Sequence, residues 1–308
     1  MKLKKILYYL IHDRTAFAIA ILQRMAILIP DRLYIRLLFR LKMGYPLDLK
    51  NPQTFNEKLQ WMKLYDRKPE YTKLVDKYQV KQYVAAAIGK QYIIPTLGVW
   101  DRFEDIDFSS LPEQFVLKTT HGGGGGGVVV CRNKSTFDID NARDKIVSSL
   151  KNDIYRSLRE WPYKDVPKRI IAEKYIHDGN DELRDYKFFC FNGHVKCFKI
   201  DFNRFIDHHA NYYNPDGNLL PFGEECYLPD YSKTLEIPDN LHDMIELAES
   251  LSKGHPFLRV DLYNTKGKIY FGELTFFPAS GLGKFTSPEW DSQLGEYIDL
   301  RQYDSENI

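Results

Sequence analysis

Apolar residues follow two different spacings along the chain, one typical of amphipathic helices and one typical of strands. Helical spacing occurs before residue 90, where it predicts helices over 31–43, 55–64 and 71–88. Short runs of β-branched and aromatic residues, bounded by turn residues, predict strands in the rest of the chain. These runs cover residues 92–95, 115–118, 128–131, 169–176, 186–191, 194–202, 257–263 and 269–275. The pattern predicts an α+β fold.

Several of these elements begin or end at residues with a specific capping or turn chemistry. Thr54 and Glu57 have the spacing of a capping box, which begins the second helix, and Gly89 ends the third. Asn192-Gly193 lies between two predicted strands and is a strong signal for a two-residue hairpin. Residues 266–268 form the predicted turn of a second hairpin.

A run of glycines separates the strands predicted over 115–118 and 128–131. The run consists of Gly122, Gly123, Gly124, Gly125, Gly126 and Gly127. Glycine has no Cβ and adopts positive φ freely, so the backbone N–H groups of such a loop can donate to phosphate oxygens. Lys118 ends the first strand and would reach the same phosphates. The alternative is a flexible linker, which the flanking strands disfavour. No Gly-Lys-Ser/Thr sequence follows, so the run is not a Walker A loop.

The strands 257–263 and 269–275 bring acidic residues together. Pairing these strands as a hairpin places Asp261 close to Glu273. Their hard carboxylate oxygens suit Mg²⁺, which also bridges to nucleotide phosphates. Arg259 precedes Asp261 by two residues, hence shares its strand face, and would neutralise charge on a transferred phosphoryl or acyl group. The alternative, a surface strand pair with scattered charges, is disfavoured by the apolar neighbours.

Two further segments offer candidate nucleotide contacts. The strand 169–176 contains Glu173 and Lys174 and ends at Ile176. Such a strand can read a purine edge through main-chain N–H and C=O groups, with Lys174 as a side-chain donor. The alternative is an edge strand with a solvated Glu-Lys pair. Lys77, in the helix predicted over 71–88, would by itself be an ordinary solvent-facing lysine.

Composition and charge limit the class of protein. The 308 residues can bury a large core and form about two domains. The net charge of +1 implies no nucleic-acid partner. The four cysteines show no Cys-x-x-Cys spacing and follow no secretory signal, which predicts reduced thiols in a cytoplasmic protein.

Residues 1–43 are markedly basic. The segment contains nine Lys and Arg residues and only two acidic residues, Asp13 and Asp31. Its net charge is therefore +7, which leaves a net charge of −6 for the rest of the chain. Charged residues interrupt each apolar run, so no transmembrane helix is predicted. Asp31 is a candidate N-cap and Gly44 a candidate stop of a helix with basic residues along one side. Such a helix can lie on an anionic membrane face, or it can pack its leucines on the domain and solvate its arginines.

The order of the candidate segments resembles that of the ATP-grasp superfamily: an early lysine, a strand ending in lysine before a glycine flap, a Glu-Lys hinge strand, an Arg-x-Asp strand and a Glu strand. Three stretches resemble the TupA-like branch, associated with teichuronopeptide and capsular polysaccharide synthesis. They are NPQTFNEKLQW at 51–61, RDYKFFCFNG at 184–193 and YFGELTF at 270–276. The resemblance covers about residues 50–300. It implies an α+β ATP-grasp fold that holds the nucleotide between two subdomains.

The resemblance also implies an organisation in four parts. These are a basic helical extension over 1–50, an N-terminal region over 51–114, a lid subdomain over 115–178, and a C-terminal subdomain with the metal site over 179–308. The implied cofactors are ATP and Mg²⁺.

Individual site residues follow from the same resemblance. The implied nucleotide contacts are Lys77, Lys118, the glycines 122–127, Glu173, Lys174 and Ile176. The implied Mg²⁺ ligands are Asp261, Glu273 and Thr275. Arg259 would steady the reacting intermediate, and Ser280 and Gly281 would face the acceptor. Thr275 stands where the superfamily commonly has Asn, and six glycines exceed the run expected of this branch. The loop 203–214 adds Arg204, His208 and His209, either as ligands of an acceptor carboxylate or as ordinary polar loop residues.

The implied activity is that of an ATP-dependent carboxylate-amine ligase, which phosphorylates a carboxylate and lets an amine displace the phosphate. The expected partners are a uronic-acid-type glycan or its precursor and an amine such as an amino acid, with membrane-surface contact through residues 1–43. Three alternatives stay open: a glycosyltransferase of the same pathway, a phosphotransferase, and a non-catalytic ATP-binding adaptor. The glycine flap disfavours the first, and the Arg259, Asp261 and Glu273 set disfavours the last.

Overall fold

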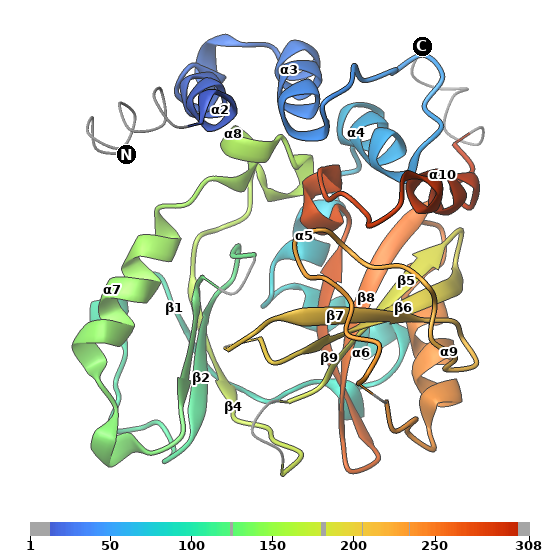
Figure 1. Cartoon of the computed structure of the whole chain (residues 1–308). Coiled ribbons are helices and arrows are strands. Elements are labelled where there is room, and N and C mark those ends of the chain that lie inside the picture. The colour runs from blue at the N-terminus through green and yellow to red at the C-terminus, as the bar shows by residue number, and fades with distance from the viewer. Residues whose placement is uncertain (1–12, 124–125, 180–182, 205, 234, 301–308) are drawn as a thin grey trace.

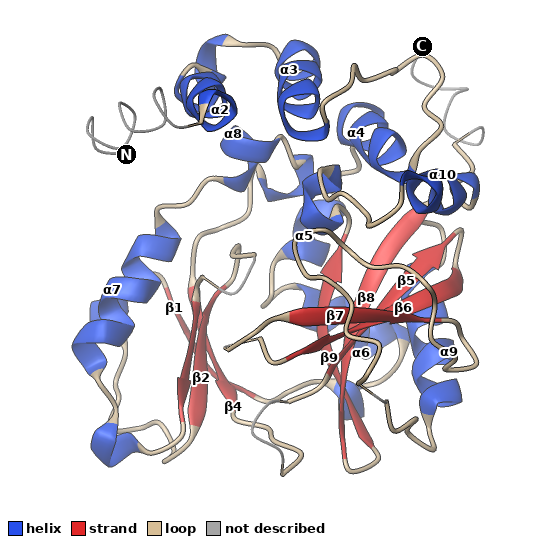
Figure 2. Cartoon of the chain, in the orientation of Figure 1, coloured by secondary structure: helices blue, strands red, loops and turns tan. Residues whose placement is uncertain are grey.

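The structure is a computed structural model that describes residues 13–123, 126–179, 183–204, 206–233 and 235–300. Two antiparallel sheets lie side by side, and helices cover their outer faces and one shared end (Figure 1). Helices and strands alternate irregularly along the chain (Figure 2), which confirms the predicted α+β class.

The helices are α2 (Arg14–Arg24), α3 (Asp31–Met43), α4 (Phe55–Tyr65), α5 (Tyr71–Val75), α6 (Val80–Ala87), α7 (Ile139–Leu150), α8 (Ile154–Leu158), α9 (Leu241–Ser252) and α10 (Pro288–Glu296). The strands are β1 (Thr96–Trp100), β2 (Phe115–Thr119), β3 (Val128–Cys131), β4 (Ile170–Lys174), β5 (Asp185–Phe191), β6 (His194–Phe202), β7 (His209–Tyr213), β8 (Phe257–Thr265) and β9 (Lys268–Thr275).

The first sheet has the strand order β1-β4-β2-β3. Strand alternation turns Phe115 and Leu117 of β2 toward Ile146 of α7, in a core that these elements share. Lys118, the next residue after Leu117, therefore points to the opposite face, together with Glu173 of β4. This opposite face therefore presents Lys118 and Glu173, two of the predicted nucleotide residues.

The second sheet has the order β7-β6-β5-β8-β9, and α9 packs on one face of it. Phe188 of β5 pairs with Phe198 of β6 and with Val260 of β8, and all three are fully buried in the core that includes Met244 of α9. The residues between these apolar positions point to the other face. That face carries the charged residues of the site.

Two turn and cap predictions and one helix stop are confirmed. Asn192 and Gly193 form the β5–β6 turn with φ of 50° and 82°, values that the turn requires and that asparagine and glycine tolerate. Thr54 and Glu57 form both hydrogen bonds of a capping box at α4. Gly44 ends α3 in the left-handed conformation. All four cysteines are free thiols.

Other predicted boundaries were wrong. Asp31 is the first residue of α3 rather than its N-cap, because its carboxylate binds Arg67 and Arg159 instead. The strand predicted over 92–95 begins only after Pro95, at β1. The alternative of an edge strand at 169–176 is also wrong, since β1 and β2 flank β4 on both sides.

The helix predicted over 71–88 is divided into α5 and α6, and the break has a local cause. The Asp76 carboxylate accepts hydrogen bonds from the backbone N–H groups of Tyr78 and Gln79, which begins a new helix. The N–H of Lys77 instead donates to the Thr120 carbonyl at the end of β2, at 2.9 Å. The break therefore carries Lys77 out of its helix to the base of the glycine loop.

Candidate active site

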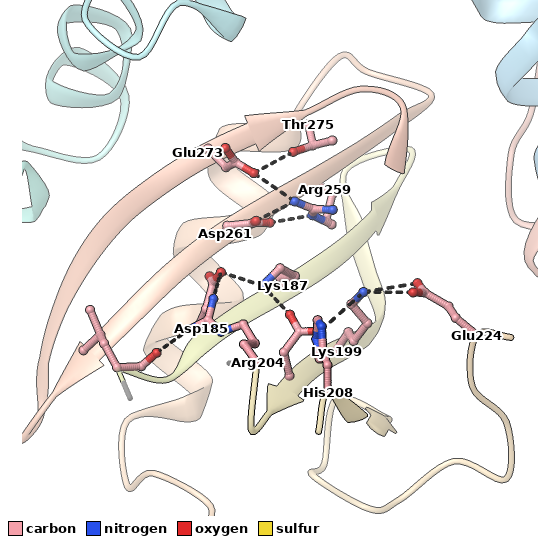
Figure 3. Close-up of polar contacts among 12 residues, drawn as sticks. Asp185, Lys187, Lys199, Arg204, His208, Glu224, Arg259, Asp261, Glu273 and Thr275 are labelled. Carbon is pink, nitrogen blue, oxygen red and sulfur yellow. Dashed lines mark hydrogen bonds and ion pairs between the residues drawn. The ribbon is translucent and has the colours of Figure 1, made fainter. Parts of the chain in front are cut away.

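Four predicted residues converge on neighbouring strands at one end of the second sheet. Asp261 on β8 pairs directly with Glu273 on β9, and Arg259 pairs with Thr275. The Arg259 guanidinium donates to both Asp261 oxygens at 2.7 and 2.6 Å and to Glu273 Oε1 at 3.1 Å (Figure 3). Thr275 Oγ1 donates to the same Glu273 oxygen at 3.4 Å. The predicted pairing of the two carboxylates and the shared face of Arg259 are confirmed.

The Glu273 and Asp261 carboxylates differ in pKa and in exposure to solvent. Burial opposes ionisation of Glu273, but Lys77 and Arg259 outweigh this effect and lower its pKa to about 2. Burial raises the pKa of Asp261, and the two-point contact with Arg259 acts against that rise. The Glu273 side chain is 36% exposed, whereas Asp261 is almost fully buried. Glu273 is therefore the carboxylate that an incoming cation meets first.

The donor set fits a magnesium ion that is shared with a nucleotide. Among the described residues no three His, Cys, Asp or Glu side chains surround a common point. Two carboxylates and the Thr275 hydroxyl supply hard oxygen atoms, and Mg²⁺ usually takes its remaining ligands from water and substrate phosphates. Asp261, Glu273 and Thr275 would thus hold the metal together with the phosphates rather than alone.

Lys77 connects this acidic pair to the glycine loop. Its Nζ atom donates to Glu273 Oε2 at 3.0 Å and to the Gly122 carbonyl at 2.8 Å. Residues from the two sheets therefore meet at a single ammonium group. This position supports the predicted contact of Lys77 with a nucleotide phosphate.

A second ion-pair cluster lies on the first sheet. The buried Glu173 carboxylate binds Lys118 at 2.7 Å and Lys81 at 2.5 Å. Burial opposes ionisation of Glu173, yet the two lysines lower its pKa to about 2. Lys81, from α6, was missing from the predicted set. Its only sequence signal is its position one helical turn after Lys77.

This cluster predicts a specific loss of stability in acid. The folded-state pKa of Glu173 lies below its ordinary value of 4.5, so the stabilisation is complete above the ordinary value and is lost as pH falls. We expect Glu173→Gln to remove about 3 kcal/mol of pH-dependent stability, most of it between roughly pH 5 and pH 2. Urea unfolding at several pH values measures this slope. Glu113→Gln, at an exposed acid before β2, is the control, and parallel profiles for wild type and Glu173→Gln would contradict the ion-pair assignment.

The remaining hinge residues lie apart from Glu173. The backbone N–H of Lys174 donates to the Pro95 carbonyl at 2.9 Å, and its exposed side chain points to the opposite face of β4. There it lines a shallow cavity of about 620 Å³ with Leu97, Gln114 and Tyr175. Ile176 is half-buried in the loop after β4. A role of Lys174 and Ile176 in adenine binding stays a prediction.

The glycine loop joins β2 to β3 as predicted, although its glycines are needed for a different reason. Gly124 and Gly125 lie outside the described residues. Of the described glycines in the loop, none has a positive φ. A Cβ at Gly122 would lie 2.3 Å from Thr119 Oγ1, and one at Gly127 would lie 2.3 Å from Ser149 Oγ. Lack of space against Thr119 and Ser149, which contact each other, therefore excludes larger residues.

A pair of alanine substitutions tests this explanation. Gly127→Ala places a methyl group against two hydroxyls, so we expect it to destabilise the loop by about 1–3 kcal/mol and weaken ATP binding. Gly126→Ala is a matched control, because no atom lies within 4 Å of the Cβ position. Isothermal titration with ATP and thermal unfolding measure both effects. Equal behaviour of the two variants would show that backbone freedom, not space, selects glycine.

A row of charged side chains that the sequence interpretation missed continues the polar face of the second sheet. Lys187 on β5 lies opposite Asp261 and binds Asp185 at 2.5 Å and Asp201 at 2.7 Å. Lys199 on β6 contacts Asp201 and binds both Glu224 oxygens at 3.2 Å. Figure 3 shows these residues in one row that leads away from Asp261. The sequence does contain a signal for this row. Charged residues two positions apart in apolar strands, as at 185 and 187 or 199 and 201, indicate a shared polar face of the sheet.

The predicted acceptor residues fall at different places around this row. His208 Nε2 donates to Asp201 Oδ1 at 3.0 Å, and its ring stacks on Tyr227, so it joins the row. Arg204 donates to the Leu183 carbonyl and lies 3.6 Å from Asp185. His209 contacts Asp207 and the Leu228 carbonyl on the loop side of β7. His208 and Arg204 thus border the charged row, whereas His209 lies on the loop side.

Ser280 and Gly281 are held in an unusual backbone conformation by α4. Ala279, Ser280 and Gly281 all have positive φ, between 45° and 59°. Gln60 donates to the carbonyls of Ser280 and Gly281, and the buried Lys63 donates to the Ser280 carbonyl and hydroxyl at 2.8 Å. Helix α4 therefore fixes the turn at 279–281, which follows the candidate metal ligands in the sequence.

Comparison with known proteins gives a family and distant structural neighbours. A sequence model described as "TupA-like ATPgrasp" matches residues 57–299, and no curated protein matches significantly. D-alanine–D-alanine ligase from Bacillus anthracis is 16% identical over 76% of this chain and 70% of that chain, with a TM-score of 0.41. D-cycloserine synthetase DcsG is 16% identical over 74% of this chain and 71% of that chain, with a TM-score of 0.42. The ATP-grasp ligase PsnB, complexed with a precursor variant, Mg and ADP, is 12% identical over 72% of this chain, with a TM-score of 0.40. The match covers 57% of PsnB, so this chain spans less than two thirds of its length.

The family match includes Lys77, Lys118, Glu173, Asp261 and Glu273, and it extends over more than three quarters of the chain. A single family model therefore covers both sheets and the candidate site residues on them. The predicted resemblance and the predicted ATP-grasp fold are confirmed: the chain belongs to the TupA-like ATP-grasp family.

Proposed function

We propose that this protein is an ATP- and Mg²⁺-dependent carboxylate-amine ligase. The observation that carries the proposal is the meeting of both sheets at Lys77, which binds the glycine-loop carbonyl and the Glu273 carboxylate at once. Lys77 thereby joins the glycine loop to the acidic pair, and a triphosphate would bind in the region around this junction. A triphosphate in this region would have cations on one side and carboxylates for its metal on the other.

The side chains have distinct tasks in this reaction. The metal, when bound, would neutralise phosphate charge and hold the γ-phosphoryl group in line. Lys77 and Lys118 would bind phosphate oxygens, and Arg259 would stabilise charge on the reacting group. The acceptor carboxylate attacks the γ-phosphorus and the bond to ADP breaks. An amine then attacks the acyl carbon, inorganic phosphate leaves, and the amine loses a proton as the amide forms.

For the acceptor we propose a carboxylate-bearing glycan, of the uronic-acid type, and for the amine an amino acid. The charged row next to Asp261 supports a carboxylate acceptor, because Lys187, Lys199 and Arg204 lie along it and would exchange their present partners Asp185 and Glu224 for the acceptor carboxylate. The association of the family resemblance with teichuronopeptide and capsular polysaccharide synthesis supports the glycan.

Release of ADP and phosphate from Mg·ATP tests the activity against a panel of uronic-acid glycans and amino acids. We expect ADP only when a carboxylate and an amine are both present, with one amide formed per ADP. ADP release with a carboxylate alone, leaving a stable phosphorylated product, would indicate a phosphotransferase instead. ATP binding without ADP release under any combination would favour a non-catalytic adaptor and contradict the ligase proposal.

A further inference from the structure

The N-terminal helices and the turn between them expose six apolar side chains. Ile27 and Leu28, in the short turn Ala26–Leu28 between α2 and α3, are each 76% exposed. Further exposed apolar residues flank them on both helices. We call this set the apolar ridge; it consists of Ile21, Met25, Ile27, Leu28, Leu33 and Leu37. An exposed apolar patch of this kind marks an interaction surface.

The ridge belongs to a well-packed part of the fold. Leu22 and Ala26 of the first helix region share a buried cluster with Tyr34 and Leu38 of α3. Each ridge residue on α2 and α3 comes one position before a buried residue of this cluster, as Leu33 does before Tyr34. The ridge residues therefore lie beside the surface at which α2 and α3 pack together. Leu38 thus packs inward, whereas Leu37 is exposed. The helix pair has a complete internal core without the ridge residues.

Contacts with the body of the protein hold this layer in place. The Asp31 carboxylate binds Arg67 at 2.7 Å and Arg159 at 3.0 Å. Arg159 also donates to the carbonyls of Ala26 and Ile29, on either side of the exposed turn. The turn that carries Ile27 and Leu28 is therefore fixed in a position that keeps them in solvent.

The charge around the ridge is strongly positive. The described basic residues of this segment are all exposed; they are Arg14, Arg24, Arg32, Arg36, Arg40 and Lys42. The two acidic residues are engaged locally, since Asp13 caps α2 and Asp31 binds Arg67 and Arg159. The outer surface thus combines exposed apolar side chains with cations.

We propose that the apolar ridge lies in the interface of an anionic lipid membrane. Apolar side chains would enter the acyl boundary while the arginines contact lipid phosphates, the arrangement typical of interfacial helices. No described helix has the length and hydropathy to span a bilayer, so the contact is peripheral. A second copy of this chain is a poor occupant, because a symmetric contact would bring the two sets of cations together.

The position of the layer suits such a contact. In Figure 1, α2 and α3 form the outermost layer at one end of the molecule, beyond α4 and α8. Neither sheet would be covered by a membrane at that end. The proposal is independent of the ligase activity, since no ridge residue belongs to the candidate active site.

Flotation with vesicles tests the proposal on the full chain. The vesicles contain phosphatidylcholine, with or without phosphatidylglycerol as the anionic lipid. We expect wild type to float only with anionic vesicles, and the double variant Ile27→Asp/Leu28→Asp to bind at least about tenfold more weakly. Arg32→Gln/Arg36→Gln should bind more weakly and with a smaller dependence on salt.

Matched variants on α7 serve as controls. Ile139→Asp replaces an exposed apolar residue, and Lys145→Gln/Lys151→Gln removes two exposed charges, both far from the ridge in sequence. Thermal unfolding and ADP release in solution show whether each variant is folded. Binding that the ridge variants retain, or that the α7 variants lose equally, would overturn the proposal. Ridge-dependent dimers in sedimentation velocity, without vesicle binding, would also overturn it.

Discussion

Glu273→Gln is expected to lower Mg²⁺-dependent ADP release by roughly 10²–10³-fold in kcat while the protein stays folded. The amide keeps the shape of the carboxylate but removes the charge that binds Lys77 and Arg259. It also replaces the more accessible of the two candidate metal carboxylates with a neutral amide, whose single oxygen is a weaker ligand for Mg²⁺. The loss should therefore appear in turnover and in the Mg²⁺ concentration required, more than in the affinity for ATP alone.

Steady-state kinetics at several Mg²⁺ concentrations measures this effect. Glu246→Gln is a suitable control, because Glu246 is exposed on α9 and contacts only His242 in the described structure. Circular dichroism confirms that both variants fold. Turnover of Glu273→Gln close to that of wild type would show that Glu273 is a structural partner of Lys77 rather than part of the metal site.

Lys63→Met is expected to have the largest effect on stability, about 3–5 kcal/mol. Lys63 is completely buried, and its ammonium group donates to Gln60, to the Leu158 carbonyl and to Ser280. Burial lowers its pKa to about 8, and the charge of the buried Glu160 acts in the opposite direction. Methionine fills a similar volume but leaves Glu160 and the Ser280 carbonyl without their cation.

Urea unfolding measures the expected loss, with Lys73→Met as the control at an exposed lysine of α5. A second readout separates positioning from stability. If Lys63 holds the turn at Ser280, a folded Lys63→Met protein at low temperature should show a higher KM for the acceptor and an unchanged KM for ATP. Stability equal to that of wild type would mean that the Lys63 and Glu160 charges do not support each other.

The parts of the fold that could be predicted from the sequence are those specified by local chemistry. The capping box at Thr54 and the Asn192-Gly193 turn each act within a few residues, and both occur where expected. The Asp76 carboxylate caps the second half of the predicted helix locally, but the position of Lys77 in the break could not be predicted in this way, because its N–H donates to the Thr120 carbonyl, which lies far away in sequence. The same holds for Asp31, whose carboxylate binds Arg159 rather than its own helix.

The candidate site shows the same limit. Asp261 and Glu273 were identified because one hairpin joins them, so the strand register follows from a short turn. Lys187 and Lys199 were missed because their position beside Asp261 depends on the order of strands in the sheet. Lys81 was missed because its partner Glu173 comes from a distant strand. Alternation predicted that Arg259 shares a strand face with Asp261, but not which strands would be neighbours.

The ion pairs of Lys77 give the site a thermodynamic property. In the protein without ligands the cations and the carboxylates neutralise one another across the two sheets. At the proposed site, a triphosphate that arrives alone would draw Lys77 away from Glu273 and leave that carboxylate uncompensated. A divalent cation that arrives alone would compete with Lys77 and Arg259 for the same oxygens. Each ligand would therefore make binding of the other more favourable, and this reciprocal coupling would favour the metal-nucleotide complex over either component.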